Sequence, residues 1–142
     1  MSAYADTSFL ASLYVLDDNS APAAARMKRA KLPLLMTSFG ELELTNAVAL
    51  RLFRKELSGS QVKAAHALIR KDLDDGVLLV NALPVSAFER AKRISRKQTP
   101  RLGTRTLDVL HVASALVLQA DTFYTFDTRQ AKLAAAEGLL VP

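Results

Sequence analysis

The chain has 142 residues, the size of one common domain with its own hydrophobic core. It contains no cysteine, which excludes disulfide bonds, cysteine-ligated zinc and thiol catalysis and suits a reducing cytoplasm. No apolar run is long enough to span a bilayer, and residues 1–4 lack the basic start of a secretory signal, so we expect a cytoplasmic protein without a membrane partner. The formal charge of +5 favours an anionic partner, nucleic acid first.

Helices are predicted where apolar residues recur three and four apart between capping residues, and strands where short apolar runs lie between them. The predicted strands cover residues 2–5, 32–36, 77–80 and 122–126, with a fifth over 139–141. The predicted helices cover 7–17, 21–30, 40–55, 61–73, a basic helix that begins at Pro84 and ends in a loop over 98–103, then 107–119 and 128–137. Ser20 is expected to cap the second helix, and Thr104 or Thr106 the helix over 107–119.

This alternation indicates an α/β fold: one domain over residues 1–142, with a mostly parallel central sheet of four to five short strands flanked by helices. No repeat, low-complexity segment or linker interrupts the chain. Right-handed crossovers then bring the carboxyl end of every strand to the same edge of the sheet, where α/β proteins bind their ligands.

The predicted topology divides the acidic residues into those at the carboxyl edge of the sheet and those at the opposite edge. Asp6 and Asp127 follow the first and fourth strands, while Glu41, Glu43 and Asp108 lie in the first turns of helices that begin at the same edge. The remaining aspartates lie at helix ends or just before strands, where we expect solvated turn residues at the opposite edge. They are Asp17, Asp18, Asp72, Asp74, Asp75 and Asp121.

Several converging carboxylates without histidine or cysteine favour hard cations, Mg²⁺ or Mn²⁺, over zinc. Two carboxylates about 5 Å apart repel by roughly 3 kcal/mol at an effective dielectric near 20, so four together need a cation, shared protons or an arginine. Each residue also has a simpler interpretation. Asp6 and Asp127 are good helix N-caps, and Asp108 suits the positive end of a helix. Periodicity does not decide between Glu41 and Glu43, of which at most one can face the site.

The chain resembles, over essentially its whole length, the PIN-domain ribonucleases and most closely the VapC-like toxins of type II toxin–antitoxin pairs. Four stretches in order carry the resemblance: Tyr4-Ala5-Asp6-Thr7-Ser8, Glu43-Leu44-Thr45-Asn46-Ala47, Leu107-Asp108-Val109-Leu110-His111-Val112-Ala113 and Thr125-Phe126-Asp127-Thr128-Arg129-Gln130. Phe9 and Val109 stand where smaller residues are common in the family. The resemblance selects Glu43 over Glu41.

The resemblance implies a central first strand and a Mg²⁺ site, with Mn²⁺ as a substitute, formed by four residues that are both catalytic and metal-binding: Asp6, Glu43, Asp108 and Asp127. It also implies hydrolysis of an RNA phosphodiester bond, a homodimer and inhibition by a VapB-like antitoxin. Thr7, Ser8 and Asn46 are expected to orient ligands or water.

A basic segment leads directly to Asp108 and is a candidate RNA contact; the alternative is an ordinary solvated helix face. The candidate residues are Arg93, Arg96, Lys97, Arg101 and Arg105. His111 is expected to be a core or interface residue, with support of Asp108 as the alternative.

The competing function is a catalytically silent PIN-fold module that binds RNA or protein, which would need a broken acidic set. A phosphotransferase of the haloacid dehalogenase type is set aside, because Ser8 stands where that chemistry usually needs a second aspartate.

Overall fold

A computed structural model describes residues 2–142, which form four strands and seven helices. All strand pairs are parallel, and the order across the sheet is β3-β2-β1-β4. The strands are β1 (Ala3–Ala5), β2 (Leu34–Thr37), β3 (Leu78–Asn81) and β4 (Thr122–Tyr124). The first strand is therefore interior, as expected, with Tyr4 opposite Leu35 on one side and Phe123 on the other.

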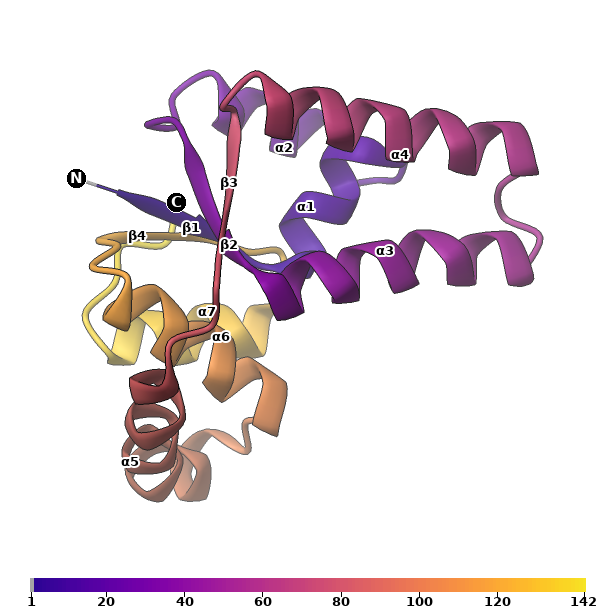
Figure 1. Ribbon diagram of the computed structural model, residues 1–142. Coiled ribbons are helices and arrows are strands. Elements are labelled where there is room, and N and C mark those ends of the chain that lie inside the picture. Colours follow the sequence, from indigo (N-terminus) through magenta and orange to yellow (C-terminus); the bar gives the residue numbers. More distant parts are fainter. Residues whose placement is uncertain (1) are drawn as a thin grey trace.

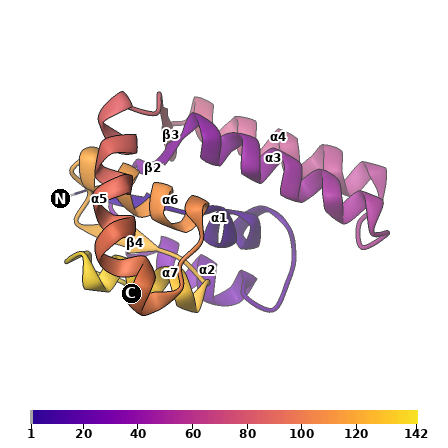
Figure 2. The ribbon, with the colours of Figure 1, turned by 90° about the horizontal axis from the view of Figure 1, so that it is seen from below.

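Helices cover both faces of the sheet (Figure 1). On one side lie α1 (Thr7–Tyr14), α2 (Ser20–Met27), α3 (Ser38–Phe53) and α4 (Gly59–Asp74). On the other lie α5 (Val85–Leu102), α6 (Thr106–Val117) and α7 (Thr128–Ala136). The α3–α4 pair extends well beyond the sheet as a long antiparallel hairpin (Figure 2). Within residues 2–142, no helix is long and apolar enough to cross a membrane.

Alternation along the strands divides the core in two. Ala3 and Ala5 pack towards α1–α4, whereas Tyr4 between them packs with Phe123 towards α5–α7. Tyr4 is fully buried, and its ring stacks on Phe123 with 5.4 Å between centroids. Because β1 is buried on both faces, the residue that follows it, Asp6, is held at the edge of the sheet in a fixed position.

The largest differences from the predicted boundaries lie in residues 98–103 and 139–141. The loop expected over residues 98–103 is the last part of α5, which continues through Pro100 to Leu102. Proline removes one helical hydrogen bond, but Ile94 and Gln98 are buried on the same helix, and Gly103 then ends it with a left-handed backbone, φ 63°. This packing outweighs the local helix-breaking signal.

The predicted fifth strand is reduced to a single parallel bridge between Thr122 and Leu140. Residues 139–141 therefore lie beside β4 without forming a ladder. Two predicted caps are also displaced by one position: Asn19 rather than Ser20 precedes α2, and Arg105 rather than either threonine precedes α6.

Candidate active site

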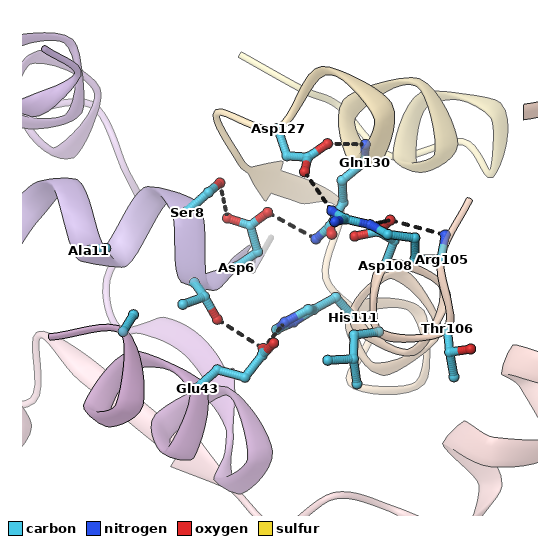
Figure 3. A pocket seen from close by; sticks show the side chains of 13 residues that line it. Asp6, Ser8, Ala11, Glu43, Arg105, Thr106, Asp108, His111, Asp127 and Gln130 are labelled. Atoms are coloured by element: carbon cyan, nitrogen blue, oxygen red, sulfur yellow. Dashed lines mark hydrogen bonds and ion pairs between the residues drawn. The ribbon is translucent and has the colours of Figure 1, made fainter. Parts of the chain in front are cut away.

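A cleft of about 650 Å³ opens at the carboxyl end of the sheet, and we call it the acidic cleft (Figure 3). Four carboxylates line it: Asp6, Glu43, Asp108 and Asp127. They come from the end of β1, the second turn of α3, the first turn of α6 and the residue before α7. None of the six aspartates predicted at the opposite edge lines the cleft, and Glu41 faces α4 instead.

Asp6 is the most completely bonded of the four carboxylates. Its Oδ1 accepts hydrogen bonds from Ser8 Oγ at 2.7 Å and from the Phe9 amide at 3.0 Å, so it also caps α1. Its Oδ2 accepts from Thr125 Oγ1 at 2.5 Å and from Gln130 Nε2 at 2.9 Å. Burial raises the pKa of Asp6, and the bonds from Thr125, Ser8 and Phe9 oppose that rise. Capping and a role in the cleft coexist in one side chain.

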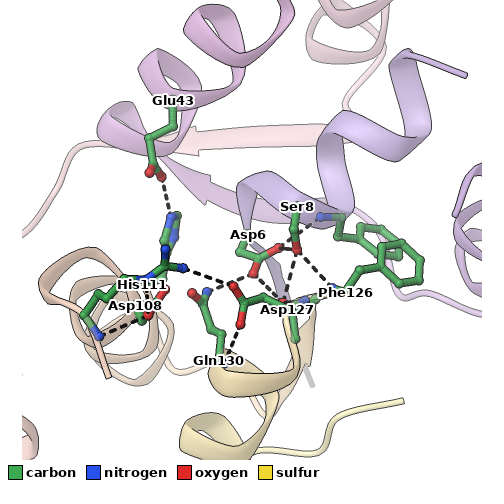
Figure 4. A network of polar contacts seen from close by, with 11 residues as sticks. Asp6, Ser8, Glu43, Asp108, His111, Phe126, Asp127 and Gln130 are labelled. Carbon is green, nitrogen blue, oxygen red and sulfur yellow. Dashed lines mark hydrogen bonds and ion pairs between the residues drawn. The ribbon is translucent and has the colours of Figure 1, made fainter. Parts of the chain in front are cut away.

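Glu43 ends a chain of contacts that starts in the core. The buried Tyr4 hydroxyl lies 2.8 Å from Nδ1 of His111. On the other side of the ring, His111 Nε2 lies 2.5 Å from Glu43 Oε1 (Figure 4). Thr7 Oγ1 donates to the same oxygen at 2.9 Å. Burial alone would raise the pKa of Glu43, but the hydrogen bond and charge of His111, helped by Thr7, hold it below its usual range. Burial raises the pKa of Tyr4, so its hydroxyl keeps its proton.

Asp108 and Asp127 share one counter-ion. Arg105 Nε lies 3.2 Å from Asp108 Oδ2, and Arg105 Nη2 lies 3.2 Å from Asp127 Oδ2. The Arg105 amide also donates to Asp108 Oδ2 at 3.1 Å, while Asp127 Oδ1 caps α7 by accepting from the Gln130 amide at 3.0 Å. Asp108 is therefore a buried acid at a helix start with its charge compensated locally.

Residues 3–136 match the model of the PIN-domain family. The chain is a PIN domain. PIN domains are typically nucleases. No curated protein sequence matches the chain.

Solved structures share this PIN fold at low sequence identity. VapC20 of Mycobacterium tuberculosis, described as a sarcin–ricin loop cleaving toxin, is 19% identical with a TM-score of 0.70, and the match covers 97% of each chain. FitAcB of Neisseria gonorrhoeae is 17% identical over 98% of this chain and 95% of its own, with a TM-score of 0.68. PAE2754 of Pyrobaculum aerophilum is 16% identical over 99% and 83%, with a TM-score of 0.67.

Of the other residues singled out in the sequence, some line the acidic cleft of this PIN domain and some do not. Thr7 and Ser8 line it and bond Glu43 and Asp6, but Asn46 is exposed and does not line it. Among the basic residues, Arg105 alone lines it. The others are exposed on α5 and outside the cleft: Arg93, Arg96, Lys97 and Arg101.

Sequence reasoning missed Thr125 and Gln130 and the contact that His111 makes with Glu43. His111 is buried as expected, but it bonds Glu43 rather than Asp108. Thr125 and Gln130 are buried donors to Asp6. Their spacing from Asp127 carried a signal, because one stands two residues before it and the other at the third position of the helix it caps.

The donor set of this PIN domain suits a hard divalent cation. Glu43 receives both protein bonds on Oε1, and Asp108 both on Oδ2, so within residues 2–142 their other oxygens accept no hydrogen bond. As the side chains stand, however, no three acidic or histidine residues in the described chain converge closely enough to hold one ion. Arg105 and Gln130 are the groups between the carboxylates. Oxygen ligands therefore fit Mg²⁺ or Mn²⁺ in kind, and filling the site requires the side chains to move closer together.

Proposed function

We propose that this PIN domain is a Mg²⁺-dependent endoribonuclease and the toxin of a VapBC-like toxin–antitoxin pair. The observation that carries the proposal is the convergence of four carboxylates, from four separate elements, in one cleft. A site of that charge on a chain of net charge +5 suits an anionic polymer, since basic residues hold phosphates while a cation neutralises the acids. PIN-domain nucleases generally use a divalent metal, which supports the choice of cofactor.

In this proposal Asp6, Glu43, Asp108 and Asp127 hold the cation, which is Mg²⁺ or, as a substitute, Mn²⁺. A bound ion would stabilise charge on the scissile phosphate and lower the pKa of the attacking water. In-line attack would break the bond to the 3′-oxygen and leave 5′-phosphate and 3′-hydroxyl ends.

The chain's own residues preorganise the cleft. His111 and Thr7 hold one oxygen of Glu43 and leave the other without a hydrogen bond in the described chain, and Ser8 and Thr125 fix the Asp6 carboxylate. Asn46 lies outside the cleft, and in this proposal it contacts water or RNA around the cleft. The basic residues of α5 would contact RNA phosphates further from the scissile bond: Arg93, Arg96, Lys97 and Arg101.

The partner proposals follow the family. We infer a cytoplasmic homodimer inhibited by a small VapB-like antitoxin. Support for an RNA target is the description of VapC20 as a toxin that cleaves the sarcin–ricin loop. At 19% identity that likeness supports RNA as the class of substrate and leaves the individual RNA to experiment.

The test is RNA end-mapping in cells that express the wild type or the Asp6→Asn variant, followed by cleavage in vitro with Mg²⁺ and with EDTA. We expect discrete 5′-phosphate ends from the wild type, none from Asp6→Asn, and complete loss in EDTA. A thermal unfolding curve shows whether Asp6→Asn remains folded. Cleavage that survives both the substitution and EDTA contradicts the proposal.

The silent binding module lacks a specific observation in its favour, because all four carboxylates are present and line the cleft. It would be supported by tight RNA binding without hydrolysis of any tested RNA in Mg²⁺ or Mn²⁺.

A further inference from the structure

Arg105 is the cation that the acidic cleft already contains. Its guanidinium group reaches two of the four carboxylates at the same time, Asp108 and Asp127, at 3.2 Å each (Figure 3). The two acids stand on different elements, at the start of α6 and before α7, and in the described chain they form no ion pair with any other basic residue. Arg105 therefore joins two walls of the cleft.

The arginine engages one oxygen of each acid: Oδ2 of Asp108, whose Oδ1 stays free of hydrogen bonds within residues 2–142, and Oδ2 of Asp127, whose Oδ1 caps α7. These two carboxylates therefore cannot turn both oxygens to a cation while the guanidinium stays. Two cations also repel each other at such short range. Occupation by Arg105 and occupation by a divalent ion are consequently alternatives for this side of the cleft.

The Arg105 side chain is largely exposed, and the hydrogen bond that caps α6 comes from its backbone amide. Arg105 is 66% exposed, whereas Asp108 is 7% exposed and retains the hydrogen bond from the Arg105 amide when the guanidinium moves. A second hollow, lined by Arg105 together with Phe126, Asp127, Thr128 and Arg129, lies next to the acidic cleft and offers the displaced group a polar position. The start of α6 stays capped in both arrangements.

We propose that Arg105 is an internal counter-ion that competes with the divalent cation for Asp108 and Asp127 and so sets the metal concentration at which the site fills. The inference rests on the proposed metal site and adds a residue that opposes metal binding. It also assigns to Arg105 a role beyond general attraction of RNA, which the other basic residues can share.

The test measures Mn²⁺ binding to the metal-free full-length protein. Isothermal titration calorimetry gives the affinity, and the electron paramagnetic resonance signal of free Mn²⁺ gives an independent value. The variants are Arg105→Gln, Arg105→Lys and the control Arg129→Gln. Arg129 also lines the neighbouring hollow and loses the same charge, but it forms no ion pair in the described chain. Unfolding midpoints establish that each variant is folded.

We expect Arg105→Gln to bind Mn²⁺ about three- to ten-fold more tightly than the wild type, as the loss of two partly exposed ion pairs predicts. The Mn²⁺ affinity of Arg105→Lys should lie between those of the wild type and Arg105→Gln. A lysine keeps the charge but lacks the branched guanidinium group that reaches both acids. Arg129→Gln should stay within about two-fold of the wild type, since exposed charges without a partner contribute little.

Four outcomes overturn the inference. Equal Mn²⁺ affinity of the wild type and Arg105→Gln, or equal tightening in Arg105→Gln and Arg129→Gln, removes Arg105 as a specific competitor but leaves the metal site intact. Weaker binding in Arg105→Gln would make the arginine a support of the site. Absence of Mn²⁺ binding in all four proteins would overturn the proposed metal site together with the inference.

Discussion

The contact between Tyr4 and His111 allows a sharp test of how the site is attached to the core. Tyr4→Phe removes a single hydroxyl group, and with it the 2.8 Å bond to His111 Nδ1, while the ring and its stacking on Phe123 stay. Tyr4 is fully buried and His111 is 3% exposed, so water cannot replace the lost partner.

A buried polar group left without a partner costs about 1–3 kcal/mol of unfolding free energy. For a chain of this length that corresponds to a fall in Tm of roughly 3–10 °C. Tyr124 provides the matched control: it is buried on the neighbouring strand, and its hydroxyl forms no hydrogen bond within residues 2–142. Tyr124→Phe should change stability by less than about 0.5 kcal/mol.

Urea unfolding followed by circular dichroism measures both variants against the wild type, with equal m-values required for the comparison. Because His111 in turn holds Glu43, we also expect Tyr4→Phe, and not Tyr124→Phe, to weaken Mn²⁺ binding. Equal stability of the two variants would refute the view that the core tyrosine positions His111.

Two further predictions concern regions away from the acidic cleft. Burial and Asp72, which accepts the Tyr14 hydroxyl at 2.6 Å, raise the pKa of Tyr14. The unfolded chain then loses that proton first, near its ordinary pKa of about 10, so stability should fall as the pH rises above about 10. Urea unfolding at neutral and alkaline pH should show a smaller loss for Tyr14→Phe, and an unchanged loss would contradict this assignment. Gly103→Ala should cost about 1–2 kcal/mol, since its φ is 63°, whereas Gly59→Ala, where an added Cβ meets no atom within 4 Å, should be neutral or stabilising. Thermal unfolding of the Gly103→Ala and Gly59→Ala variants measures this difference in stability. Equal unfolding midpoints would count against a left-handed end to α5.

The fold was largely predictable because its signals are local. Apolar periodicity and caps located every helix and the four strands, and the alternation predicted a parallel sheet covered on both faces, while the interior position of β1 was expected from the family resemblance. The extension of α5 through Pro100 was not predictable in this way, since it depends on the burial of Ile94 and Gln98. The apolar run over residues 139–141 likewise does not show how far it pairs with β4, and in the structure it forms a single bridge at Leu140.

In the candidate site, too, some residues were predictable from the sequence and others depend on tertiary packing. Topology places Asp6 and Asp127 at one edge because parallel strands end together, and the structure brings both into the acidic cleft with Glu43 and Asp108. The supporting contacts join residues remote in sequence: Glu43 and His111 are 68 positions apart, and Asp6 and Gln130 are 124 apart. No spacing rule links such pairs. They follow only from the packing of α3, α6 and α7 around β1.

The most direct test of the central claim is a crystal of the wild type grown or soaked with Mn²⁺ and measured for anomalous scattering. The account predicts an anomalous peak in the acidic cleft, within bonding distance of oxygens from Asp6, Glu43, Asp108 and Asp127, with the Arg105 guanidinium turned away. An Asp108→Asn crystal treated in the same way should show a weakened peak or none. A wild-type crystal with Mn²⁺ only outside the cleft, or with an equal peak in Asp108→Asn, would contradict the four-carboxylate metal site.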